Sequence, residues 1–163
     1  MTTWLQAGPE AIRSLLTDMK AHRGPWQTDD VHGLSRRMGW TLNEVIEGEI
    51  ATGHAGFGVR KNEIVCYFHE GLLDHITVGI TENVREDGTD RDRFMWDAFA
   101  DTAAEGVAVL GEPTDRDHTE PPTVRWRLED STILVKNLES AVTVTWASNR
   151  FQDEWDQIVE ALA

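Results

Sequence analysis

Apolar side chains recur along this chain with two different periods. Behind Gly8-Pro9 they follow at i, i+3, i+4 and i+7, as Ile12, Leu15, Leu16 and Met19. That spacing puts them on one helix face, and proline suits the first position of a helix. The helical period predicts four helices, over residues 9–22, 29–38, 92–107 and 150–162. Thr28 or Asp29 is expected to cap the second helix, and Asn149 with Gln152 to form a capping box for the last.

A period of two predicts strands between the helices. Over residues 72–81 one set of alternating positions is mostly apolar, which indicates a strand with one buried face. Similar segments, broken by turn residues, lie between residues 40–81 and between residues 123–147. They predict about six to seven antiparallel strands in the order αα-βββ(β)-α-βββ-α. We therefore expect a single α+β domain over residues 1–163, with the helices on one face of the sheet. The two halves repeat this order only weakly.

Composition and charge narrow the class of protein. The chain has 163 residues, of which 40% are hydrophobic and 27% charged, and its formal net charge is −14. This excess of acid argues against partners that are nucleic acids or anionic membranes, because both recruit basic side chains. No apolar run approaches the ~20 residues that span a bilayer, and the first residues lack the pattern of a secretion signal. We expect a cytoplasmic protein.

The acidic residues are concentrated in residues 82–120, which hold four basic and twelve acidic side chains and so a net charge of −8. Asp97, Asp101 and Glu105 stand at i, i+4 and i+8, a repulsive row on a helix, with Phe94 projecting between the first two. The alternative to a binding surface is a solvated face that keeps the protein soluble. The predicted partner-binding residues are Asp87, Asp90, Asp92, Phe94, Asp97, Asp101, Glu105, Glu112, Asp115 and Asp117.

Motifs for catalysis or metal binding are not evident, so we predict no catalytic, cofactor-binding or metal-ligating residue. Cys66 lies in an apolar strand and is expected in the core. The glycines of residues 53–58 have the order G-x-x-G-x-G between two strands, which favours a bulge or hairpin over a phosphate loop. His69 and His75 flank a tight turn, and a weak metal site there is the alternative to solvent-facing histidines. Among seven tryptophans, Trp96 alone falls at the edge of its helix's apolar face.

Several short motifs carry a family resemblance across nearly the whole chain. They are Met38-Gly39-Trp40, Phe57-Gly58-Val59, the helix from Phe94 to Phe99, Leu110-Gly111-Glu112-Pro113-Thr114, Val124-Arg125-Trp126-Arg127 and the paired strands ending at Trp146. Together they resemble a family of small, acidic, largely uncharacterised actinobacterial proteins. That family is similar to immunity proteins of polymorphic toxin systems, including those that block secreted NAD-hydrolysing toxins. The resemblance implies no active-site residues.

Three hypotheses of function follow. The first is a non-enzymatic immunity protein, monomeric before binding, that occludes the active site of a cognate toxin with a basic surface. The second is a secretion chaperone or adaptor, because such small acidic α+β proteins have a related order of elements. Chaperones of that type usually dimerise, so the size of the purified protein separates the two. The third is a small enzyme with a carboxylate pair, which requires a deep pocket around two buried acids.

Overall fold

Four helices form where the apolar period predicts them. The computed structural model describes residues 4–22, 30–119 and 121–163. The helices are α1 (Pro9–Ala21), α2 (Val31–Met38), α3 (Thr89–Leu110) and α4 (Asn149–Leu162). α3 is longer than the predicted 92–107 at both ends: it begins at Thr89, with Asp90 in its first turn where the helix dipole favours an acid, and it runs on to Leu110.

Two helix caps differ from the prediction by one or two residues. The side chain of Asp30 caps α2 by accepting a hydrogen bond from the Gly33 amide at 2.8 Å, whereas Thr28 and Asp29 lie outside the described residues. The side chain of Ser148, not Asn149, caps α4 by accepting from the Phe151 amide at 3.0 Å. Asn149 instead donates to the carbonyls of Leu128 and Glu129 and so ties α4 to a strand turn.

The strands form one antiparallel sheet of eight, in the order β1-β2-β3-β4-β8-β7-β6-β5. Their bounds are β1 (Thr41–Ile46), β2 (Ile50–His54), β3 (Ile64–His69), β4 (Leu72–Gly79), β5 (Asp115–Asp117), β6 (Thr123–Arg127), β7 (Ser131–Asn137) and β8 (Val142–Ser148). The prediction of six to seven strands is too low because β5 is an exposed edge strand of three charged residues, which carries no apolar signal.

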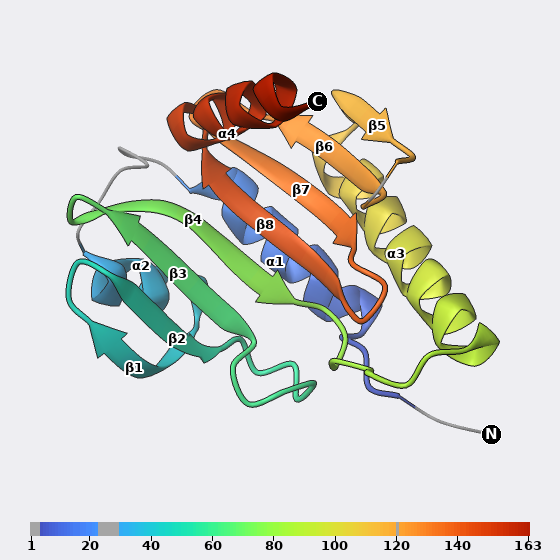
Figure 1. Cartoon of the computed structure of the whole chain (residues 1–163). Coiled ribbons are helices and arrows are strands. Elements are labelled where there is room, and N and C mark those ends of the chain that lie inside the picture. The colour runs from blue at the N-terminus through green and yellow to red at the C-terminus, as the bar shows by residue number, and fades with distance from the viewer. Residues whose placement is uncertain (1–3, 23–29, 120) are drawn as a thin grey trace.

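The sheet is built from two meanders of four strands that meet where β4 pairs with β8. Each meander is preceded by a long helix, α1 in the first half and α3 in the second, and these two helices pack against each other. The weak repeat of the sequence is therefore a repeat of architecture (Figure 1). α4 has no counterpart after β4, where the chain runs on to α3.

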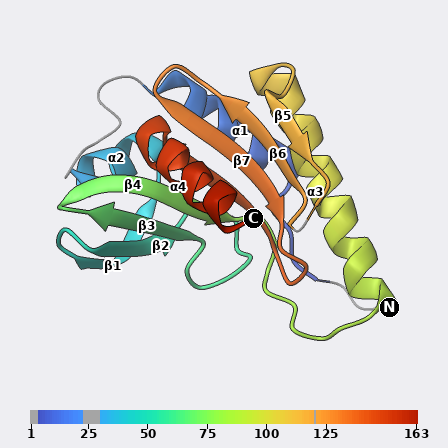
Figure 2. The same cartoon turned by 45° about the horizontal axis from the view of Figure 1, so that its top comes forward.

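Helices lie on both faces of the sheet, which corrects the one-face prediction. α1 and α3 lie behind the sheet in Figure 1, whereas Figure 2 shows α4 in front of it, across β7 and β8. Neighbouring residues of β4 accordingly point to opposite faces of the sheet. Ile76 joins the main core, and the ring of His75 stacks on Phe151 of α4 at 4.3 Å.

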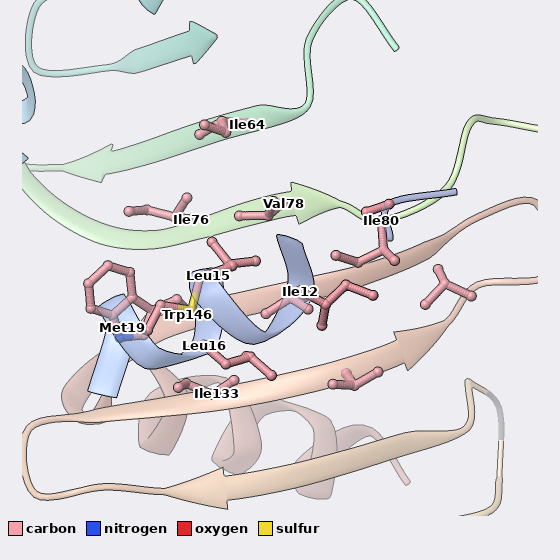
Figure 3. Packing of buried hydrophobic residues seen from close by; sticks show 14 of the residues in the cluster. Ile12, Leu15, Leu16, Met19, Ile64, Ile76, Val78, Ile80, Ile133 and Trp146 are labelled. Carbon is pink, nitrogen blue, oxygen red and sulfur yellow. The ribbon is translucent and has the colours of Figure 1, made fainter. Parts of the chain in front are cut away.

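The main core lies between the sheet and α1 with α3. The apolar face of α1 packs over β4 and β8, against Ile76, Val78 and Trp146 (Figure 3). Trp126 of β6 is 2% exposed, and its indole Nε1 donates to the Gly111 carbonyl at the end of α3. This layer fixes α3 against the second meander and so positions the groove described next.

Candidate functional site

An open groove runs between α3 and the β5–β6 edge of the sheet. We call it the α3 groove, and its volume is about 370 Å³. Its lining residues are Trp96, Phe99, Ala100, Ala103, Ala104, Val107, Arg116, Asp117, His118, Thr123 and Val124. The α3 side is entirely apolar, and a volume of this size matches that of small-molecule or side-chain binding sites.

The sequence of α3 explains both the depth and the chemistry of the groove. Ala100, Ala103 and Ala104 are small, so they leave a hollow where larger side chains would fill the space. Trp96 stands beside them with 49% of its surface exposed. An exposed tryptophan next to an apolar hollow is the pattern of an anchor in a protein interface.

Two carboxylates of α3 lie outside the lining of the groove. Asp97 and Asp101 are both exposed, and neither has an ion-pair partner among the described residues. The other side of the groove carries Asp117 of β5, whose carboxylate accepts two hydrogen bonds from Thr119 that lower its pKa. The α3 groove is therefore apolar along α3, and its β5 side carries charged side chains of both signs, Arg116 and Asp117.

Glu105 does not continue this unpaired row, contrary to the prediction. Its carboxylate receives two hydrogen bonds from the Arg13 guanidinium of α1, at 2.9 and 3.2 Å, and these lower the pKa of Glu105. Residues four apart on a helix are offset by about 40°. The row therefore turns from solvent at Asp97 towards α1 at Glu105. The compensating arginine lies 92 residues away in the sequence, so helical spacing could not reveal it.

Phe94 is not the exposed anchor that the sequence predicted. Its ring is half-buried and meets the ring of Trp4 edge to face, with the centroids 5.5 Å apart. It packs against the core and helps to hold the N-terminal segment on α3. Trp96, two residues further on, takes the exposed place.

The remaining predicted residues do not form one patch with Asp97 and Asp101. Asp90 and Asp92 lie in the first turn of α3, and Asp87 precedes that turn beside Arg91, at 3.5 Å. Glu112 is exposed just after α3. Asp115 of β5 lines a different pocket, beside α4. Of the ten predicted residues, Asp117 lines the α3 groove, whereas Asp97 and Asp101 lie on α3 outside its lining.

The glycine-rich segment binds an anion of its own chain. The carboxylate of Glu63, which is 2% exposed, accepts hydrogen bonds from the backbone amides of Ala55, Phe57 and Val59 at 2.9–3.1 Å. Burial alone raises the pKa of Glu63, but the backbone hydrogen bonds outweigh it, and the pKa lies below its ordinary value. Residues 55–59 form a loop around this carboxylate.

The sulfur and imidazole groups have structural surroundings. Cys66 is fully buried, as predicted, and burial raises its thiol pKa to about 12. His75 is stacked between Tyr67 and Phe151 instead of facing solvent, at ring distances of 4.5 and 4.3 Å. Within the described ranges, no group of three or more His, Cys, Asp or Glu side chains is placed to hold a metal ion.

The sequence contains a sign of the α3 groove that the spacing of apolar residues does not reveal. Ala100 and Ala104 are exposed positions of α3, where long polar residues are the usual choice. Small apolar residues on a solvent face, one and two turns from an exposed Trp96, indicate a hollow instead of a solvated helix.

These features define a class: an α+β protein whose described residues form an eight-stranded antiparallel sheet with helices on both faces and a largely apolar groove beside one helix. The chain belongs to DUF6301, a family of unknown function, whose model matches residues 10–148, from α1 to the end of β8. No curated protein and no solved structure matches the chain. None of the described helices is both long and apolar enough to cross a membrane.

Proposed function

We propose that this protein is a cytoplasmic, non-enzymatic immunity protein, whose α3 groove binds a cognate secreted toxin and thereby occludes the toxin's active site. The observation that carries the proposal is the combination on one helix of an exposed Trp96, an alanine-lined hollow and two unpaired carboxylates. The family resemblance adds the class of target, secreted toxins that include NAD-hydrolysing ones.

The chemistry of the groove favours a protein partner with a basic surface. Apolar side chains of the partner can fill the hollow beside Ala100 and Ala104, and burial of that area supplies affinity. Lysine or arginine side chains of the partner, next to its apolar contact residues, can form ion pairs with Asp97 and Asp101. Such charge complementarity accelerates association and makes it sensitive to salt.

Co-expression with a toxin tests this function. The C-terminal domain of a large secreted protein encoded next to this chain is expressed in a bacterial host, with or without the chain. We expect the wild-type chain to restore growth and the double variant Asp97→Lys/Asp101→Lys to restore it less well.

The matched control is Glu44→Lys/Glu49→Lys, which changes the net charge equally on exposed residues of the first meander. It is expected to protect like the wild type. Failure of the wild-type chain to protect would contradict the toxin-binding proposal, and equal loss in both double variants would contradict the role of the α3 groove.

A second candidate, a secretion chaperone or adaptor, is favoured by α4. Ile158 and Leu162 of this helix are 51% and 83% exposed, an apolar stripe of the kind that pairs subunits. Sedimentation of the purified protein separates the candidates: a stable dimer that Ile158→Ser dissociates favours the adaptor, and a monomer favours the immunity protein.

A further inference from the structure

A second pocket lies beside α4 and shares Asp117 and Thr123 with the lining of the α3 groove. We call it the α4 pocket, and its volume is about 340 Å³. It is enclosed by α4, β5, β6 and β7, on the sheet face away from the main core. Its lining residues are Asp115, Asp117, Pro121, Thr123, Arg125, Leu134, Lys136, Gln152, Trp155, Asp156 and Val159.

Lys136 of β7 supplies an unmatched positive charge to this pocket. Its side chain is largely buried, and its ammonium group has no hydrogen bond or ion pair with any described residue. Burial lowers the pKa of Lys136, the neighbouring Arg125 lowers it further, and Asp156 raises it in part. The ammonium group lines the pocket and keeps contact with solvent, so an anion that enters the pocket can reach it.

Two more polar atoms on the same sheet face lack hydrogen-bond partners among the described residues. Arg125 forms a bidentate ion pair with Asp156, at 2.7 and 3.0 Å, but its buried Nε has no acceptor. Thr143 lies directly across from Lys136 in the β7–β8 register, is 4% exposed, and has an unpartnered hydroxyl. Of these groups, Lys136 and Arg125 line the pocket, and their hydrogen-bond donors match the oxygens of an anion. Thr143 lies outside the lining, next to Lys136 on the neighbouring strand.

The acidic residues around the pocket limit the charge of that anion. Asp156 is already neutralised by Arg125 and accepts a further hydrogen bond from Gln152 at 2.9 Å. Asp115 and Asp117 are exposed, so water and salt screen them, whereas the charge of Lys136 is screened less. A single negative charge suits this balance, and a phosphate dianion does not.

The rest of the pocket is apolar. Leu134 forms part of its floor on β7, and α4 contributes Trp155 and Val159, which are 48% and 51% exposed. A flat or aliphatic body can pack on these side chains. We propose that the α4 pocket binds a small organic monocarboxylate, with its carboxylate at Lys136 and Arg125 and its apolar body against Trp155 and Leu134.

NMR titration of the full chain tests this site. The probes are sodium benzoate and sodium indole-3-acetate, and the neutral control is benzamide. We expect saturable shifts of the methyl signals of Thr143, Leu134 and Val159 with the carboxylates and none with benzamide. Lys136→Met should weaken benzoate binding at least about tenfold. The matched control Lys61→Met, at an exposed lysine, should bind like the wild type.

A measurement on the wild type covers the case in which Lys136→Met does not fold. Benzoate should raise the pKa of the Lys136 ammonium followed by nitrogen NMR, because an adjacent anion favours the charged form. The proposal is overturned if neither carboxylate gives saturable shifts at these methyls, if benzamide binds as well as benzoate, or if benzoate leaves the Lys136 titration unchanged.

Discussion

His75 shows at the scale of one residue how burial sets a property that the sequence does not display. The imidazole is stacked between Tyr67 and Phe151, and its Nδ1 is buried without a hydrogen-bond partner among the described residues. Burial first, and then the charge of Lys136, lower the pKa of His75 to about 4. The side chain is therefore neutral at physiological pH.

His75 is expected to make the folded state sensitive to acid. Between pH 6.5 and pH 4 the unfolded chain protonates this histidine and the folded chain does not, so stability falls as the pH falls through this window. His75→Phe keeps the stacking and removes this dependence, about 2 kcal/mol after allowance for solvent screening. Urea unfolding at several pH values measures it. The control His32→Phe should lose stability on acidification like the wild type. If His75→Phe also loses as much stability as the wild type between pH 6.5 and pH 4, the assignment to His75 is contradicted.

Glu63 contributes stability in the opposite protonation state. Because the loop amides lower its pKa, this contribution is present above the ordinary pKa near 4.5 and is lost as the pH falls through the folded-state pKa. We expect Glu63→Gln to cost about 1–2 kcal/mol at pH 7, since a neutral amide accepts the three backbone hydrogen bonds less well. The difference from the wild type should shrink towards pH 3. A constant difference at all pH values argues against a role of the charge.

Single residues were predictable when only their local environment mattered. Cys66 lies in an apolar strand and is in the core. Phe94 and Glu105 were misplaced because their partners, Trp4 and Arg13, are about 90 residues away in the chain. The role of Glu63 could not be predicted, because the glycine-rich segment before it resembles a loop that binds an external phosphate and nothing in the pattern points to a carboxylate of the same chain.

At the scale of elements, α3 is held to the sheet by a contact that requires glycine. A Cβ atom placed on Gly106 meets the indole of Trp126, with Cζ2 at 2.7 Å. That indole is fixed in turn by its hydrogen bond to Gly111 at 2.8 Å. The close approach sets the position of α3 and therefore the shape of the α3 groove.

Gly106→Ala is therefore expected to destabilise the protein, although alanine favours helices by about 1 kcal/mol over glycine. Overpacking against Trp126 should outweigh that gain and leave a net loss of about 2 kcal/mol in unfolding free energy. The control Ala108→Gly, at an exposed position of the same helix, should lose about 1 kcal/mol. A Gly106→Ala variant more stable than the wild type contradicts this packing.

The apolar periods predicted helices and long strands well, because both elements bury one face. They could not predict β5, whose three charged residues pair with β6 through the backbone alone. They located α4 along the chain but not on the correct face of the sheet. Its apolar stripe stays largely uncovered, and Gln152 is its only fully buried residue. An amphipathic pattern shows that a helix has an apolar face, and not what covers it.

At the scale of the whole molecule, two similar halves carry different surfaces. Both contain a long helix followed by a four-stranded meander, with α2 between them in the first half. The α3 groove, the α4 pocket and α4 itself belong to the second half. The uneven charge of the sequence, −8 over residues 82–120, follows the same division. Sequence alone could place that charge in one half, but the groove appears only when α3 and β5 lie side by side.

The most direct test of the account is the association rate of the purified chain with the toxin domain, measured by stopped flow at several salt concentrations. We predict fast, salt-sensitive association for the wild type and for Glu44→Lys/Glu49→Lys. Asp97→Lys/Asp101→Lys should associate about tenfold more slowly at low salt, with a weaker salt dependence. An unchanged rate in that variant, with binding intact, contradicts the claim that the α3 groove, together with Asp97 and Asp101 on the same helix, is the contact surface.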